Sequence, residues 1–236
     1  MPSAYLLISH GSRDPRPAAS IAQLADRLRQ RLSAPVGTAV LECAPTPLSA
    51  QIQHFSQQIG QNRSIELVPL FLLPGVHMSE DIPKQIEIAR SQLQSQLTLL
   101  PHIGSHSGIT ALLKRRFGTA ENRILLSHGS RRSGVNASVE AIGREVNATI
   151  AYWLVSPSVT DQVAQLINQG CQQITILPYF LFSGGITDAI EKSIGDLTQR
   201  YLDVDLQLLS PIDLSDDLVD LVVELIQSTQ PQPLKK

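Results

Sequence analysis

Residues 6–13 read LLISHGSR and residues 124–131 read ILLSHGSR, so six of the eight positions are identical. A second pair of matching segments follows along the chain, VPLFLLPG at residues 68–75 and LPYFLFSG at residues 177–184. In each pair an apolar run of strand-like length leads into a turn that contains glycine. Because self-similarity at a fixed period indicates a repeated structural unit, these segments predict a fold built twice from one pattern of elements.

A weaker third match fixes the length of the repeat. Residues 39–45, AVLECAP, align with residues 151–157, AYWLVSP, and the spacing of all three matches stays near 110–118 residues. The sequence therefore predicts an N-terminal lobe over residues 1–118 and a C-terminal lobe over residues 119–236. The expected boundary is the short glycine-containing stretch at residues 117–122.

Each lobe alternates short apolar runs with amphipathic stripes. The runs are rich in Val, Ile and Leu, as in strands that are buried on both faces of a parallel sheet. The expected strands lie at residues 4–9, 36–42, 66–73, 97–100, 123–127, 148–155, 173–182 and 204–209. Helical stripes with apolar residues three and four apart lie between them, for example from Ile21 to Leu32 and from Ile186 to Leu197. The pattern predicts an α/β protein of two similar lobes, each a parallel sheet flanked by helices.

Composition narrows the class of protein. Apolar residues make up 42% of the chain, which excludes intrinsic disorder, and the net charge of −2 gives no basic field for nucleic acid or an anionic membrane. The apolar run at residues 67–76 contains two prolines and is much shorter than the roughly 20 residues that span a bilayer. The first residues show no signal-peptide pattern. Two isolated cysteines exclude a disulfide framework, and we expect a soluble, cytoplasmic protein.

Three polar residues follow the first three strands of the N-terminal lobe. His10 comes after the first, Glu42 ends the second and His77 follows the third. Because ligands bind at the carboxyl ends of parallel strands in open α/β sheets, we expect these side chains to converge. Two imidazoles and a carboxylate can hold a divalent metal, and imidazoles, which titrate near about pH 6.5, can also move protons.

A structural interpretation of each residue stays open. A single histidine at a strand end is often a satisfied surface group, Glu42 can be a solvated strand end, and His77 follows a Pro-Gly turn. The C-terminal lobe keeps His128 but has Leu154 and Ile186 at the other two positions. This difference predicts one working site, in the N-terminal lobe, and one degenerate copy.

The residues around His10 suggest further roles. Gly11 permits a tight turn, Ser12 can cap the following helix, and Arg13 can pair with a carboxylate or lie in solvent. His54, His102 and His106 are weaker candidates as metal ligands. Cys43 should point away from Glu42 on its strand and is expected in the core.

Two of these segments together resemble the sirohydrochlorin chelatases, the class II chelatases of siroheme and cobalamin synthesis. They are LISHGSR at residues 7–13 and PLFLLPGVHMSEDIP at residues 69–83. The resemblance extends over nearly the whole chain and includes the internally duplicated layout of the longer members. It implies two chelatase-like lobes that face a central cleft.

The resemblance also implies an activity, the insertion of a divalent metal into sirohydrochlorin. The two catalytic histidines of the family correspond to His10 and His77, and its strand-two carboxylate corresponds to Glu42, so these three are the expected metal ligands. The metal is a substrate, with Fe²⁺ favoured over Co²⁺ because the metal-rich segments of some cobalt-pathway relatives are missing. No tightly bound cofactor is expected, and two cysteines cannot ligate an iron–sulfur cluster.

Substrate contacts are expected at residues next to these ligands. Sirohydrochlorin carries several carboxylates, which Arg13, Arg131 and Arg132 can attract, while Leu73 and Met78 can line the face of the macrocycle. Gly11 and Ser12 are expected at the same place. No nucleic-acid or membrane partner is expected, and a monomer is favoured because duplication can replace a homodimer of single lobes.

Three other functions are compatible with parts of the pattern. A phosphate-transfer enzyme with a nucleophilic histidine would show an arginine directly before His10, where this chain has Ser9. A non-catalytic metal or tetrapyrrole carrier would share the same binding residues, and only turnover separates it from a chelatase. A structural α/β protein with incidental histidines would bind neither metal nor tetrapyrrole.

Overall fold

The structure is a computed structural model that describes residues 4–60, 63–132 and 134–228. The chain forms two compact units. Unit 1 comprises Met1–His106 together with Leu214–Lys236, and unit 2 comprises Ser107–Asp213. Each unit is described by itself.

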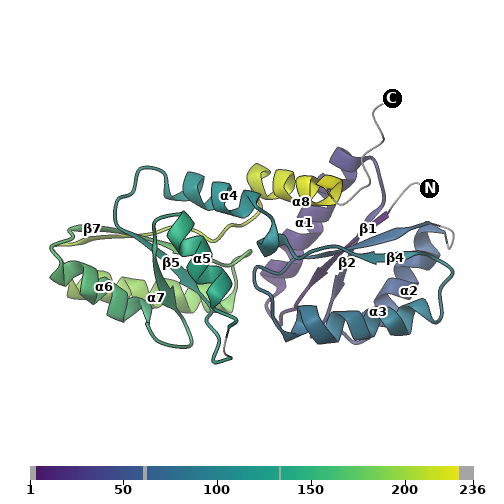
Figure 1. Ribbon diagram of the computed structural model, residues 1–236, viewed down its shortest axis with the longest axis horizontal. Coiled ribbons are helices and arrows are strands. Elements are labelled where there is room, and N and C mark those ends of the chain that lie inside the picture. The colour runs from purple at the N-terminus through teal and green to yellow at the C-terminus, as the bar shows by residue number, and fades with distance from the viewer. Residues whose placement is uncertain (1–3, 61–62, 133, 229–236) are drawn as a thin grey trace. The chain divides into compact units, whose positions relative to one another are not determined.

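Unit 1 is built on a four-stranded parallel sheet (Figure 1). Its strand order is β2-β1-β3-β4, and the register pairs Ile8 of β1 with Ala39 of β2 and with Pro69 of β3. The strands are β1 (Ala4–Ser9), β2 (Val36–Val40), β3 (Ile65–Pro69) and β4 (Leu97–Leu99). Because the chain order reverses direction at β1 and β3, their carboxyl ends form the switch point at which such sheets bind ligands.

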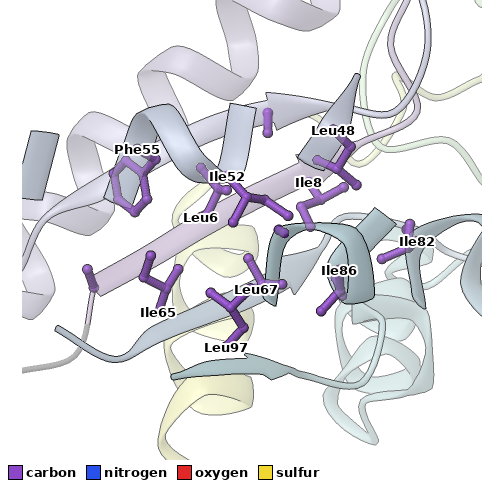
Figure 2. Close-up of a cluster of buried hydrophobic side chains, with 13 residues drawn as sticks. Leu6, Ile8, Leu48, Ile52, Phe55, Ile65, Leu67, Ile82, Ile86 and Leu97 are labelled. Atoms are coloured by element: carbon purple, nitrogen blue, oxygen red, sulfur yellow. The ribbon is translucent and has the colours of Figure 1, made fainter. Parts of the chain in front are cut away.

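Helices cover both faces of this sheet. They are α1 (Pro15–Leu32), α2 (Leu48–Ile59), α3 (Ile82–Arg90) and α8 (Asp216–Ser228), with a π-helical turn η1 (His77–Asp81) and a 3₁₀ turn η2 (Ile103–Ser105). On one face α2 and α3 pack over β1 and β3, where Leu6, Ile8 and Leu67 form a buried cluster with side chains of both helices (Figure 2). The alternate strand residues Tyr5 and Leu7 are also buried and point to the other face, because successive side chains of a strand alternate.

Unit 2 repeats this architecture. Its sheet has the parallel order β6-β5-β7-β8, which corresponds strand for strand to unit 1. The strands are β5 (Arg123–Ser127), β6 (Thr149–Tyr152), β7 (Gln173–Pro178) and β8 (Asp205–Leu208), and the helices are α4 (Gly108–Phe117), α5 (Ala137–Glu145), α6 (Val159–Asn168) and α7 (Gly185–Arg200). Helices α6 and α7 bury Val163 and Ile190 in a cluster with Ile124 and Ile176 of the central strands. Two lobes with parallel sheets and flanking helices are therefore confirmed.

All eight expected strands are present, but several end earlier than the apolar runs suggest. The second strand stops at Val40 rather than residue 42, although the amide of Leu41 still donates to the carbonyl of Ser9 at 2.9 Å. The third strand stops at Pro69 rather than residue 73. The amide of Leu70 still donates to the carbonyl of Ile8 at 2.7 Å, and the residues after it form the loop that leads to His77. The expected strands were too long because the apolar runs in the sequence continue past the ends of the strands, into the loops that carry the site.

The compact units do not coincide with lobes divided at residue 118. Helix α4 ends the first repeat in sequence but belongs to unit 2, where the guanidinium of Arg116 donates to the carbonyls of Ser210 and Pro211 at 2.5 and 2.9 Å. Helix α8 ends the second repeat but lies beside α1 of unit 1 (Figure 1), where Asp220 pairs with Arg31 at 2.5 Å. Relative to the repeat in the sequence, the helices that end the two copies are therefore exchanged between the compact units.

In the part of the chain that the structure describes, no helix has the length and apolarity needed to cross a membrane.

Candidate metal centre

Three side chains meet at the switch point of unit 1. His10 follows directly after β1, Glu42 lies two residues after β2, and His77 is the first residue of η1 after β3. The parallel sheet places all three at the same edge, as the fold predicts.

The backbone fixes His10 beside Glu42. The amide of Glu42 donates to the carbonyl of His10 at 2.8 Å, which continues the hydrogen bonding of the sheet beyond the strands. Gly11 has a φ of +97°, and a Cβ there would lie 2.0 Å from the carbonyl oxygen of Glu42. Only glycine allows the two loops this close an approach. The expected turn at Gly11 is thus present, and it sets the distance between two members of the site.

The side chains form a compact donor cluster. The Nε2 atom of His10 lies 3.9 Å from Oε2 of Glu42, and the rings of His10 and His77 meet edge to face with centroids 4.7 Å apart. One ligand atom from each of the three residues lies within 4.8 Å of the others. The convergence predicted from the sequence is confirmed. Ligands at about 2.0–2.2 Å from one ion would be roughly 3–3.5 Å apart, so small side-chain rotations would close the cluster around a metal.

Asp81 completes the cluster and was not predicted. Its Oδ2 lies 2.7 Å from Nδ1 of His77, across the single turn of η1. A carboxylate on one ring nitrogen fixes the orientation of the imidazole and leaves Nε2 available as a ligand. On His10 the Nδ1 atom lies 3.3 Å from the carbonyl of Gly11, so its free nitrogen is also Nε2. The spacing of four residues between His77 and Asp81 was the sequence signal for this pair.

Hydrogen bonds from the segment at residues 102–104 hold the loop before His77 in place. The carbonyl of Phe71 accepts hydrogen bonds from Nδ1 of His102 and from the amide of Gly104, each at 3.0 Å. The ring of Phe71 in turn lies against His77, with centroids 6.4 Å apart. Burial lowers the pKa of His102, which outweighs the opposing effect of its hydrogen bond to Phe71. His102 therefore supports the loop rather than serving as one of the clustered ligands.

The predicted substrate contacts Arg13 and Met78 differ in how far they are exposed. Arg13 is exposed, and Met78 is half-buried against the core cluster under α2 and α3. The helix cap expected at Ser12 is wrong. The side chain of Asp14 accepts from the amide of Arg16 at 2.9 Å and caps α1, whereas Ser12 Oγ accepts from the amide of Asp14 at 3.0 Å, before the helix begins.

Cys43 is exposed rather than buried. The expectation of a core position is wrong because the chain leaves the strand at Val40 and Cys43 adopts a φ of +61°, which breaks the alternation of the strand.

Unit 2 has the same framework without the ligands. The amide of Leu154 donates to the carbonyl of His128 at 3.0 Å, as Glu42 does to His10, and Gly129 has a φ of +79°. Leu154 and Ile186 are exposed where unit 1 has its carboxylate and second histidine. The exposed Arg131 follows His128 in the same loop. Unit 2 therefore keeps the backbone geometry of this edge but has aliphatic side chains at the two positions equivalent to Glu42 and His77.

A hollow of about 870 Å³ lies elsewhere in unit 2, at the amino ends of β7 and β8, beside Cys171 and Leu202. The strands of the sheet are parallel, so this is the edge opposite to the one that carries His128. The one cluster of candidate metal ligands found among the described residues, His10, Glu42 and His77, does not line this hollow.

Comparison with known proteins agrees with the duplication. The CbiX family model matches the chain twice, over residues 4–120 and 122–229. A sirohydrochlorin cobaltochelatase of Priestia megaterium is 25% identical over 233 residues, which cover 87% of this chain and 72% of that protein. A chloroplastic sirohydrochlorin ferrochelatase of Arabidopsis thaliana is 26% identical over 158 residues, 62% of this chain and 68% of that protein.

Solved structures show the same fold. SirB from Bacillus subtilis with Fe³⁺ superposes with a TM-score of 0.80 at 20% identity, covering 97% of this chain and 96% of that one. The cobalt complex of SirB from Bacillus subtilis subspecies spizizenii gives 0.78 at 21% identity, with 98% of both chains covered.

Proposed function

This chain belongs to the CbiX family, and from that premise we propose that it is a sirohydrochlorin chelatase, a lyase that inserts a divalent metal into sirohydrochlorin. The observation that carries the proposal is the cluster of His10, Glu42 and His77 at the switch point of unit 1. Two imidazole nitrogens and one carboxylate oxygen suit Fe²⁺ or Co²⁺.

The cluster is suited to transient binding of its metal. His10 and Glu42 are about half exposed, with side-chain accessibilities of 51% and 52%, so a hydrated ion can reach them directly. Three protein ligands leave coordination positions for water and then for the pyrrole nitrogens of the substrate. The site therefore holds the ion while its water shell is replaced, and releases it when the macrocycle supplies four nitrogens.

The reaction must also remove two protons. Sirohydrochlorin enters with two pyrrole N–H groups, and the product is the metal complex plus two protons for each divalent ion. An imidazole or carboxylate that gives up the metal regains a free electron pair and can accept one of these protons. Metal and proton compete for the same groups, so the rate should fall as the pH is lowered. His10, His77 and Glu42 act as catalytic residues in this scheme.

Positively charged side chains next to the strand ends fit a substrate with several carboxylates. Arg13 in unit 1 and Arg131 in unit 2 are exposed and follow the two equivalent His-Gly-Ser segments. A guanidinium group can pair with a carboxylate through two hydrogen bonds. Gly11, Ser12 and Met78 are the other proposed substrate contacts in unit 1.

The proposal favours Fe²⁺ as the physiological metal and keeps Co²⁺ as the alternative. The first experiment incubates the purified protein anaerobically with sirohydrochlorin and either ion, and follows the absorbance change on insertion. Turnover above the uncatalysed rate establishes a chelatase, and the ratio of the two rates distinguishes the metals. Binding of sirohydrochlorin without turnover would instead indicate a carrier.

Substitutions then test the residues. His10→Ala and His77→Ala should each remove most of the catalysed rate, and Glu42→Gln should raise the metal concentration needed for half-maximal rate. His54→Ala is the matched control, because this histidine is exposed on α2, where its Nε2 atom forms a hydrogen bond with Gln58 of the same helix. Wild-type rates in correctly folded His10 and His77 variants would disprove the assignment.

A further inference from the structure

The carboxylate of the metal cluster is carried by a loop rather than by a strand. Strand β2 ends at Val40, and Glu42 lies in the segment 41–47 that leads to helix α2. Its side chain is about half exposed, and Oε2 lies 3.9 Å from Nε2 of His10, which is beyond hydrogen-bond distance. The backbone of this loop therefore decides where the carboxylate lies.

The side-chain amide of Gln51, half-buried on α2, joins the two ends of the loop. Its Oε1 accepts from the amide of Val40 at 3.0 Å, and its Nε2 donates to the carbonyl of Val40 at 2.9 Å. Nε2 also donates to the carbonyl of Thr46 at 3.0 Å. Among the described residues, no other hydrogen bond reaches the backbone of residues 43–46. One side chain therefore closes the loop that carries Glu42.

The contact with Val40 takes the place of a neighbouring strand. Strand β2 is at the edge of the sheet, and because the amide of Leu41 points to β1, the amide and carbonyl of Val40 point to the open side. Such groups need partners when water is excluded from them. The amide of Gln51 offers one donor and one acceptor side by side, as the backbone of a further strand would. A hydrocarbon side chain of the same size cannot form these bonds.

Unit 2 has a glutamine at the same place but does not use it in this way. Gln162 lies three residues after the first residue of α6, as Gln51 does in α2. Tyr152, the last residue of β6, instead donates its amide to the carbonyl of Pro157 at 2.8 Å. The Oε1 atom of Gln162 is buried and has no hydrogen-bond partner among the described residues. Only the unit that has kept its carboxylate closes the loop through the glutamine.

We infer that Gln51 is a positioning residue for the carboxylate of Glu42. Its amide fixes both ends of the loop and so keeps the carboxylate beside His10 and His77, where the three groups can bind one ion. Gln51 acts through the backbone of the loop. The inference rests on the proposed function in one respect, that this cluster binds a metal.

The test measures the Kd of the whole protein for Co²⁺. Gln51→Met keeps the approximate volume of the side chain and removes all three hydrogen bonds. We expect the Kd to rise about tenfold, as for the loss of other residues that orient a metal ligand. The visible absorption of bound Co²⁺ should change as well, because the carboxylate is held less firmly. An unchanged Kd in a folded variant would overturn the inference.

The chain offers a matched control in its second copy. Gln162→Met makes the same substitution at the equivalent position of α6, where Oε1 has no partner to lose. The Kd for Co²⁺ should stay within about twofold of the wild type. An equal rise in both variants would show a general effect of the substitution and would also overturn the inference.

A double substitution separates positioning from general damage to unit 1. In Glu42→Gln the carboxylate to be positioned is already gone, so the addition of Gln51→Met should change the Kd by less than about twofold. A further tenfold rise would show that Gln51 acts on the fold of the unit rather than through Glu42, contrary to the inference.

Hydrogen exchange tests the contact without any substitution. In the wild-type protein the amide of Val40 should exchange as slowly as that of Leu41, which bonds with Ser9 within the sheet. Rapid exchange at Val40 would show that the bond to Gln51 does not persist in solution, and the positioning role would be lost.

These outcomes are separate from those for the proposed function, which turnover with sirohydrochlorin tests. A protein that turns over, but whose Kd for Co²⁺ is the same in Gln51→Met, is a chelatase whose loop needs no such support. A protein without turnover, whose affinity for Co²⁺ depends on Gln51 only while Glu42 is present, holds a metal through the positioned carboxylate but does not insert it.

Discussion

The imidazole of His77 and the carboxylate of Asp81 lie 2.7 Å apart, between Nδ1 and Oδ2, across one π-helical turn. Turns of this type are rare and occur frequently at functional sites. The turn follows directly after the loop of β3, so that the first residue of the helical segment is also the ligand that enters the cluster. We therefore propose that Asp81 is a positioning residue, which holds Nδ1 of His77 and leaves Nε2 to face a bound metal.

Removal of this carboxylate should weaken metal binding. For Asp81→Ala we expect the affinity for Co²⁺ to fall by about 10- to 100-fold, as is typical when the partner of a ligating histidine is lost. Titration with Co²⁺, followed by its visible absorption, measures the change. Glu80→Gln is the control, because it removes a neighbouring exposed carboxylate. Equal affinities of Asp81→Ala and the wild type would contradict the positioning role.

Alanine at Gly11 should disturb both stability and the site. Gly11 and Gly60 both have positive φ, +97° and +94°, so alanine at either incurs a similar backbone strain of about 1 kcal/mol. At Gly60 no atom of the described residues, apart from its chain neighbours, lies within 4 Å of the new Cβ, whereas at Gly11 the carbonyl oxygen of Glu42 lies 2.0 Å away. We expect Gly11→Ala to lower the free energy of unfolding by about 1–3 kcal/mol more than Gly60→Ala.

Urea denaturation of the two glycine variants measures this difference, and Co²⁺ titration shows whether Glu42 has moved. Gly11→Ala should lose metal affinity and Gly60→Ala should not. Equal stability of the two variants would mean that the loops separate without cost, and that the close approach does not hold the site together.

The half-buried His102 should make the stability of the protein depend on pH. Burial lowers its pKa in the folded state, so on acidification the unfolded chain takes up a proton at this residue before the folded chain does. The contribution of His102 to stability is therefore complete above its unfolded pKa of about 6.5 and declines as the pH falls through the lower, folded pKa.

Unfolding by urea at several pH values around 6.5 checks this expectation. His102→Gln should be less stable than the wild type at neutral pH, and the difference should shrink as the solution becomes more acidic. His54→Gln replaces an exposed histidine and should show no such trend. A difference between His102→Gln and wild type that grows on acidification would reverse the sign of the effect and refute this account.

A second metal site should be obtainable in unit 2. The double substitution of Leu154→Glu and Ile186→His restores the donor types on a framework in which the amide of residue 154 already bonds with the carbonyl of His128. We expect the Co²⁺ stoichiometry to rise from one to two per chain. The new site should be the weaker one, because the residue four positions after Ile186 is the buried Ile190 and provides no counterpart of Asp81.

Isothermal titration with Co²⁺ gives the stoichiometry directly, and each single substitution serves as a control that should still bind one ion. A double variant that folds normally but still binds one ion would show that the edges of the two units differ in more than the identity of these side chains.

The sequence predicted the location of the site better than its supporting contacts. Buried parallel strands are recognisable as short runs of Val, Ile and Leu, and residues at the ends of such strands must share an edge. That reasoning placed His10, Glu42 and His77 together. The partner of His77 depends on the local π-helical turn, and the contact of His102 with Phe71 joins residues 31 positions apart. Neither follows from the periodicity of the apolar residues.

The exchange of helices α4 and α8 between the two units could not be predicted from the sequence either. An amphipathic stripe shows that a helix buries one face, but it does not say which sheet receives that face. Helices α4 and α8 end equivalent repeats, and their assignment to units follows from specific contacts such as those of Arg116 and Arg31. The length of the repeat could be predicted from matching segments of sequence. The boundary between the compact units could not, because it depends on these contacts.

The same exchange has a consequence for the order in which the protein matures during synthesis. Unit 2 is one uninterrupted stretch, Ser107–Asp213, so a ribosome releases all of it before α8 (Asp216–Ser228) is made. The unit that carries His10, Glu42 and His77 is translated first, but it is completed only when α8 has been made and packs beside α1. A premature stop codon shortly before residue 216 would therefore spare unit 2 and leave the unit that carries the proposed metal site incomplete.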